Sequence, residues 1–219
     1  MKIITQSKEQ RRNILFVVLL TWLPVVVFLG LIIAISLKLE RPITFFFQDF
    51  FVITNSPIYT GFVSNIGIIF WSVTAGILFF ISVVCYQFRA SRQVQWFYTL
   101  AGVITVIMLF DDFFLFHEII YPRFFNIHSG TVYIIYGVLG IIYLIVFRKN
   151  ILASNFLVLF FAFLFFFISI VFDELRERWL FDPYWIVCED GFKLLGIVNW
   201  LTYYFITSFQ SIKELVQTK

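Results

Sequence analysis

The sequence predicts an all-α membrane protein, a bundle of six transmembrane helices in a single domain that covers residues 1–219. Three observations lead to this fold class. Hydrophobic residues make up 61% of the chain and charged residues only 13%, whereas soluble domains have about 45–50% apolar and about 25% charged residues. Six apolar stretches are long enough to cross about 30 Å of hydrocarbon as helices. None of them alternates in polarity as the strands of a membrane barrel do.

The first predicted span is Ile14–Leu37. It follows three basic residues, as the core of a signal peptide would, but its apolar run exceeds the roughly 7–15 residues of such a core. We therefore expect it to be retained. Residues 41–60 come next and contain the run FFFQDFF between two prolines. This run is too short to span a membrane and too apolar for a free loop, so we expect a short interfacial or re-entrant segment.

The remaining spans are joined mostly by short connections. The second and third, Gly61–Tyr86 and Val94–Leu115, are separated by a loop of seven residues, 87–93, with two arginines. Three residues, 148–150, join the fourth and fifth spans, Thr131–Phe147 and Ile151–Phe172. The sixth, Trp185–Phe209, carries its charges in its first turns and continues through an apolar and aromatic segment. These loops are too short to hold a further domain.

The distribution of charge predicts the orientation. One side of the predicted membrane carries ten Lys and Arg residues and the other side carries six. The side richer in basic residues faces the cytoplasm, so both termini are expected there, in a bacterial-type plasma membrane. Eleven of the 13 acidic residues fall on the other side or in the outer half of a span. Because the basic residues serve topology, we expect no nucleic-acid partner; the expected partners are the lipid bilayer and other membrane subunits.

Three spans bring ionisable residues to the same depth. At 1.5 Å per residue, the outer ends of the third, fifth and sixth spans reach one level with the residues Asp111, Asp112, His117, Glu118, Asp173, Glu174, Glu189, Asp190 and Lys193. Ionisable groups within spans face the bundle interior and are usually functional. Asp111 and Glu118 are seven residues apart and would share a helix face. We predict a cup, open to the outer side, lined by Asp111, Glu118, Glu189 and Lys193.

One chemistry for this cup is metal binding. Carboxylates and a histidine suit a divalent cation such as Mg²⁺, Mn²⁺, Ca²⁺, Fe²⁺ or Zn²⁺. The predicted ligands are Asp111, His117, Glu118, Asp173 and Glu189. The sequence DDFFL from Asp111 resembles the DDxxD helix with which prenyl-transferring enzymes hold magnesium diphosphate, with Leu115 in place of the last Asp. This resemblance implies an isoprenoid-type substrate.

A second chemistry is acid–base catalysis without a metal. Glu189 and Asp190 are followed closely by Lys193, and a carboxylate in such a group can act as a general base with a raised pKa. The stretch is similar to the acidic pair of glutamic intramembrane proteases, with Asp instead of Glu at the second position. Lys193 would neutralise an anionic head group or tune Glu189. The predicted catalytic residues are Asp111, Asp112, Glu118, Glu189 and Lys193.

These observations favour a membrane-embedded enzyme, metal-dependent or acid–base, that acts on a lipid or isoprenoid-type substrate. Two other classes stay open. The chain would be a non-enzymatic subunit or assembly partner of a larger membrane complex if its polar layer only fixes helix packing. It would be a small ion or solute transporter if the carboxylates and His117 relay ions, as such groups do in pumps and transporters.

Overall fold

A computed structural model describes residues 8–48, 50–179 and 183–217, with the side chains of residues 8–21, 50, 176–179 and 183–184 outside this description. Every regular element in these residues is a helix, so the predicted all-α class is confirmed. The chain divides into two compact units, residues 1–60 and 61–219. Each unit is described by itself.

The first unit consists of one long helix and two short ones, α1 (Lys8–Lys38), α2 (Thr44–Phe47) and α3 (Phe50–Thr54). The part Trp22–Lys38 of α1 is apolar. The turn after α1 is closed by the Ser36 hydroxyl, which donates a 2.7 Å hydrogen bond to the carbonyl of Arg41. Glu40 adopts the left-handed conformation in this turn, with φ 52°. The apolar segment after the first predicted span thus forms two short helices.

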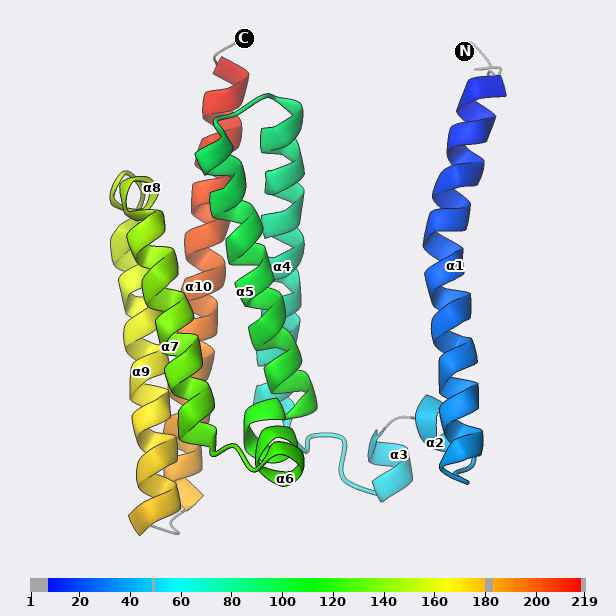
Figure 1. Cartoon of the computed structure of the whole chain (residues 1–219). Helices are drawn as coiled ribbons and strands as arrows, with labels where there is room; N and C mark the ends of the chain where they lie inside the picture. Colours follow the sequence, from blue (N-terminus) through cyan, green and yellow to red (C-terminus); the bar gives the residue numbers. More distant parts are fainter. Residues whose placement is uncertain (1–7, 49, 180–182, 218–219) are drawn as a thin grey trace. The chain divides into compact units, whose positions relative to one another are not determined.

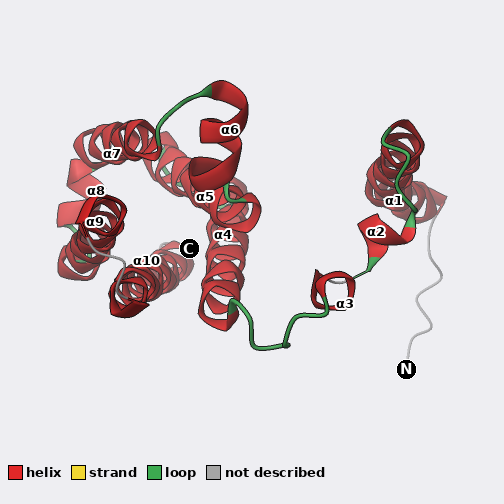
Figure 2. Cartoon of the chain, turned by 90° about the horizontal axis from the view of Figure 1, so that it is seen from below, coloured by secondary structure: helices red, strands yellow, loops and turns green. Residues whose placement is uncertain are grey.

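The second unit contains five long helices and three short elements between them. They are α4 (Phe62–Gln87), α5 (Arg92–Phe114), the π-helix η1 (Phe116–Ile120), α6 (Tyr121–Phe125), α7 (Ser129–Val146), α8 (Arg148–Leu152), α9 (Phe156–Trp179) and α10 (Pro183–Gln217). Consecutive long helices run in opposite directions (Figure 1). Seen along the bundle, they are arranged around a ring in the order α4, α5, α7, α9 and α10 (Figure 2).

Four helices in the described chain are long and apolar enough to cross a membrane, namely Phe62–Gln87, Arg92–Phe114, Ser129–Val146 and Phe156–Leu175. They correspond to the second to fifth predicted spans. The predicted start of the fifth span at Ile151 is wrong, because Ile151 belongs to α8 and α9 begins at Phe156. Ser154 accounts for the break: its hydroxyl donates to the carbonyl of Ile151 and also meets the hydroxyl of Tyr203.

The core of the second unit is largely aromatic. Its buried aromatic residues are Trp71, Phe97, Tyr98, Tyr143, Phe147, Trp200, Tyr203 and Tyr204. Their polar groups are bonded inside the bundle: the Tyr204 hydroxyl donates to that of Tyr143 at 3.0 Å, and Tyr143 donates to the carbonyl of Phe97 at 3.1 Å. The Trp200 indole donates to Thr105 at 3.0 Å. These bonds offset the cost of burying the polar groups.

Close helix packing depends on glycine where α9 meets α10. A Cβ atom on Gly196 would lie 2.5 Å from the ring of Phe166, far inside van der Waals contact. The Phe166 ring in turn stacks on Trp71 of α4, with centroids 5.7 Å apart. Small residues let the backbones of neighbouring helices approach closely in membrane bundles. Gly196 therefore allows the close contact between α9 and α10 that places Phe166 against Trp71.

Candidate functional site

A cavity of about 1140 Å³ lies inside the second unit, lined by residues of α4, α5, η1, α7, α9 and α10. At one end it is bordered by the ionisable residues Asp111, Asp112, His117, Asp173, Glu174, Glu189 and Lys193. We call this the polar end; it lies where α5 and α9 finish and α7 and α10 begin (Figure 1). The rest of the wall is almost entirely apolar. A large apolar pocket with a few convergent polar groups is the usual form of a ligand site.

At the polar end, Asp111 and His117 are bonded to each other. Nδ1 of His117 lies 2.5 Å from Oδ2 of Asp111, and the backbone N–H of His117 donates to Oδ1 at 3.1 Å. Both residues are buried. With Nδ1 engaged by the carboxylate, Nε2 faces the opposite way, 3.5 Å from Oε1 of Glu118. A carboxylate that orients an imidazole through Nδ1 is the arrangement that prepares Nε2 for proton transfer.

A break in the third span creates this pair. Helix α5 ends at Phe114, and Leu115 takes the left-handed conformation with φ 54°. The π-helix η1 then turns the chain back, so that His117 faces Asp111. The expectation that Asp111 and Glu118 share one helix face is therefore wrong, because no continuous helix connects them. The Glu118 side chain is 45% exposed, and Glu118 is not among the residues that line the cavity.

Two tyrosines of α7 complete the polar end, and the sequence reasoning missed both. Tyr136 donates a 2.9 Å hydrogen bond to Oδ1 of Asp111, and Tyr133 donates a 2.6 Å hydrogen bond to Asp173 of α9. The ring of Tyr133 also lies against that of His117, with centroids 5.1 Å apart. The two tyrosines are three residues apart, so they share one face of the helix. This pair of hydroxyl groups on one face of an otherwise apolar span is the feature of the sequence that could have indicated them.

The second charged contact joins three helices. Nζ of Lys193 in α10 lies 2.6 Å from Oδ1 of Asp112 in α5. The other oxygen of Asp112 accepts a 2.8 Å hydrogen bond from the indole of Trp71 in α4. Lys193 also lines the cavity, and its expected role, to neutralise a head group or tune Glu189, stays a prediction. The ion pair with Lys193 makes Asp112 a positioning residue for the bundle.

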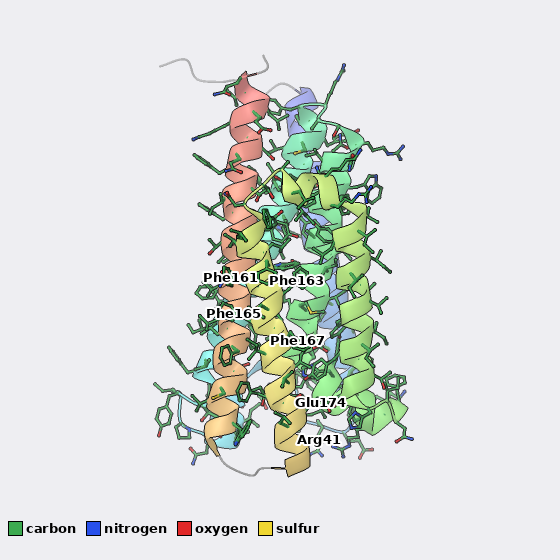
Figure 3. The ribbon with its side chains drawn as sticks, turned by 90° about the vertical axis from the view of Figure 1, so that its left-hand side faces the viewer. Arg41, Phe161, Phe163, Phe165, Phe167 and Glu174 are labelled. Atoms are coloured by element: carbon green, nitrogen blue, oxygen red, sulfur yellow. The ribbon has the colours of Figure 1, made fainter. Side chains whose placement is uncertain are left out.

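The remaining predicted acids border the cavity from α9 and α10. Asp173 is buried and bonded to Tyr133, and Glu174 reaches α7, where its Oε1 would lie 2.9 Å from a Cβ on Gly130. The backbone carbonyl of Glu189 accepts a hydrogen bond from Ser169. Figure 3 shows Glu174 on the same side of α9 as Phe163 and Phe167, facing α7, whereas Phe161 and Phe165 lie toward α10.

The structure does not assemble the predicted metal ligands into a coordination sphere. Within the part of the chain that the structure describes, no three His, Cys, Asp or Glu side chains form a group that could hold a metal ion. The physical reason lies in the hydrogen bonds: Asp111 is engaged by His117 and Tyr136, and Asp173 is engaged by Tyr133. His117 lies between Asp111 and Glu118, whereas Asp173 is bonded to Tyr133.

The surroundings of His117 change its acidity. Burial lowers its pKa, but the hydrogen bond with Asp111 and the negative charge of that carboxylate raise it more. The charge of Lys193 lowers it and that of Glu118 raises it further, and the net result is a pKa above the ordinary value of 6.5. The carboxylate of Asp111 thus makes the His117 imidazole a stronger base, with a higher pKa than an ordinary histidine.

The comparisons with known proteins identify the family. No curated protein and no solved structure matches the chain significantly. A family model described as "Domain of unknown function (DUF8692)" matches residues 14–207, which include every residue of the polar end and of the cavity wall. The chain belongs to this family, DUF8692.

Proposed function

We propose that the protein crosses the membrane six times, with α1 and α10 as spans beside the four apolar helices. Helix α1 has 31 residues and α10 has 35, both more than the roughly 20 that a span needs. The charged residues of α10 lie near its two ends, with Glu189, Asp190 and Lys193 toward the polar end and Lys213 and Glu214 toward the other, and the segment between them is uncharged. On this proposal both termini face the cytoplasm, the polar end faces outward, and α2 and α3 lie at the outer interface.

We propose that the protein is a membrane-embedded acid–base enzyme that acts on the head group of a lipid or isoprenoid-type substrate, with Asp111 and His117 as the catalytic pair. The observation that carries this proposal is the hydrogen bond between Nδ1 of His117 and Asp111 at the wall of an otherwise apolar cavity. It supports a role in which Asp111 fixes the ring and Nε2 exchanges the proton.

The chemistry that suits this pair is transfer of the head group to an oxygen nucleophile. Nε2 of His117 would accept the proton of a water or hydroxyl as its oxygen bonds to the carbonyl carbon or phosphorus of the head group. The bond from that carbon or phosphorus to the leaving oxygen breaks as the same proton passes to this oxygen, so the imidazole ends neutral, as it began. Tyr136 would hold Asp111 in place through its hydrogen bond, and the Lys193–Asp112 pair would keep α5 and α10 in register.

The test uses the full-length chain in nanodiscs of phosphatidylethanolamine and phosphatidylglycerol with a small amount of a polyprenyl phosphate. Mass spectrometry monitors every lipid over time. We expect wild-type protein to convert one of these lipid classes. We expect His117→Gln and Asp111→Asn to lower the rate by about 10²–10⁴-fold, the usual contribution of general acid–base catalysis. The class that is consumed tells a phospholipid substrate from an isoprenoid one.

Glu40→Gln is the matched control for Asp111→Asn, because the Glu40 side chain is exposed and does not line the cavity. We expect this variant to turn over lipid as the wild type does. Lipid profiles that stay unchanged with wild-type protein would contradict the proposal, and so would full activity in His117→Gln.

A second candidate function is that of a non-enzymatic subunit. The observation that favours it is that the polar side chains also tie helices together: Trp71, Asp112 and Lys193 join α4, α5 and α10, and Tyr133 with Asp173 joins α7 to α9. In this case the chain would purify with a stoichiometric membrane partner, and His117→Gln would weaken folding without changing any lipid.

A further inference from the structure

We infer that the apolar part of the cavity holds one extended hydrocarbon chain of a membrane lipid, which enters sideways between α7 and α9 at Gly137. The inference deepens the proposed function, because it takes the polar end as the place of the head group. Its evidence comes from the shape of the cavity and from the exposure of the residues along one edge of it.

The length of the cavity suits a lipid chain. Along α7 it extends from Gly130 at the polar end to Leu144, which is 14 residues, or about 21 Å at 1.5 Å each. One leaflet of a bilayer contributes about 15 Å, half of a hydrocarbon core about 30 Å thick. The cavity volume of about 1140 Å³ also exceeds the roughly 300–1,000 Å³ of ordinary ligand pockets. A head group and an extended chain fit this space together.

The cavity opens toward the bilayer along one edge of α7. Ile134, Gly137 and Ile141 are spaced three and four residues apart, so they share one face of the helix. All three line the cavity, yet Ile134 is 68% exposed and Ile141 is 58% exposed. Phe167 of α9 lines the cavity too and is 64% exposed. Since α7 and α9 are both apolar helices of membrane-spanning length, this opening faces lipid chains.

Gly137 lies in the middle of this edge, and its lack of a side chain leaves the edge open. No atom lies within 4 Å of the position that a Cβ on Gly137 would take. Glycine weakens a helix by about 1 kcal/mol relative to alanine, and no tight backbone contact requires one here. The missing side chain therefore leaves open space at this edge, between the polar end and the apolar part of the cavity, and we place the entry of the chain there.

Covalent labelling of the deepest residues of the cavity can distinguish a lipid chain bound inside it from lipid of the surrounding bilayer. Tyr143 and Trp200 both line the cavity, and each is only 3% exposed. Bulk lipid cannot contact them from outside the bundle. Ile142, next to Tyr143, is 52% exposed and reports contact with bulk lipid. Covalent labelling of Tyr143 and Trp200 is thus a direct measure of occupancy.

The experiment places the full-length chain in phosphatidylcholine nanodiscs with a trace of phosphatidylcholine that carries a diazirine in the middle of one acyl chain. After illumination, peptide mass spectrometry locates the adducts. A parallel sample uses a diazirine-bearing polyprenyl phosphate, so that an acyl chain and an isoprenoid chain are told apart. We expect adducts on Tyr143 and Trp200, as well as on Ile142, with at least one of the two probes.

Two tryptophan variants test the entry point. Gly137→Trp should reduce the adducts on Tyr143 and Trp200, relative to Ile142, by about tenfold or more, because a bulky side chain excludes other groups from the space that it fills. Gly76→Trp is the control, because Gly76 in α4 also has no atom within 4 Å of its Cβ position and does not line the cavity. It should leave the ratio unchanged.

The outcome separates this inference from the proposed function. His117→Gln should abolish lipid turnover and leave the adducts in place, which would show a chain site that does not depend on the catalytic pair. Adducts confined to Ile142 in the wild type would overturn the inference, even if lipid turnover is observed. Equal labelling of Tyr143 in Gly137→Trp and Gly76→Trp would overturn the entry point at Gly137.

Discussion

The ammonium group of Lys193 lies 2.6 Å from Oδ1 of Asp112, and this ion pair joins α10 to α5. The two residues are 81 positions apart in the sequence, and the carboxylate is only 9% exposed. The pair therefore holds the two helices on either side of the polar end at a fixed height relative to each other. It also means that the charge of Lys193 is balanced within the protein.

Loss of this pair should destabilise the protein. Lys193→Met leaves Asp112 with Trp71 as its hydrogen-bond donor. Removing one partner of a fully buried pair costs about 3–5 kcal/mol. Because the Lys193 side chain is 29% exposed, we expect a smaller loss, about 1–3 kcal/mol, measured as a lower Tm in detergent. Adding Asp112→Asn should recover part of it, and Lys149→Met on the exposed side of α8 should have no effect. A Tm equal to that of the wild type would contradict this.

The His117–Asp111 pair should make stability depend on pH. The folded-state pKa of His117 is raised, so its contribution is complete below the unfolded pKa of about 6.5 and is lost as the pH rises through the folded pKa. The Tm difference between wild type and His117→Gln should therefore be largest below pH 6.5 and shrink as the pH rises above it. A difference that grows with pH would refute the assignment.

The two glycines of α10 should respond in opposite ways to alanine. In Gly196→Ala the new methyl group meets the Phe166 ring at 2.5 Å, and overpacking of this kind costs about 1–3 kcal/mol. In Gly191→Ala no atom lies within 4 Å, so the better helix propensity of alanine should stabilise the protein by up to about 1 kcal/mol. Thermal unfolding of the two variants gives the comparison. A stabilising Gly196→Ala would show that α9 and α10 are packed less closely.

The orientation in the membrane can be tested with single cysteines. Cys85 is fully buried, so a thiol reagent outside the protein cannot reach it and its labelling would not reveal the orientation. Both native cysteines are therefore first replaced by alanine. Phe124→Cys then marks α6 at the polar end, where Phe124 is exposed, and Lys149→Cys marks α8 at the opposite end. We expect a membrane-impermeant maleimide to label Phe124→Cys on intact cells and Lys149→Cys only after permeabilisation. The reverse pattern would invert the proposed topology.

Hydropathy predicted the four apolar helices well, because length and composition alone decide whether a helix can cross a membrane. The start of α9 was missed by five residues, since Ile151 and Leu152 are as apolar as α9 itself. A hydrogen bond of the Ser154 side chain ends α8 there, and hydropathy does not register such a bond. Helix breaks of this kind depend on individual side chains.

The contacts of the polar end were harder to predict than its residues. The rise per residue places Asp111, Asp173 and Lys193 at similar depths, but the rotation of each helix about its axis depends on packing. The sequence therefore could not tell that Lys193 pairs with Asp112. Tyr133 and Tyr136 were overlooked because they lie within an apolar run, where a hydroxyl group changes the hydropathy little.

The left-handed turn at Leu115 makes the contact between His117 and Asp111 depend on the number of residues that separate them. Each residue of an α-helix turns the chain by about 100°. Deleting one residue between Phe113 and Phe116 would therefore rotate His117 by about 100° relative to Asp111. Every acid of the polar end would still be present, yet the imidazole and the carboxylate would no longer meet. A change of length in this turn would thus break the pair without removing either of its members.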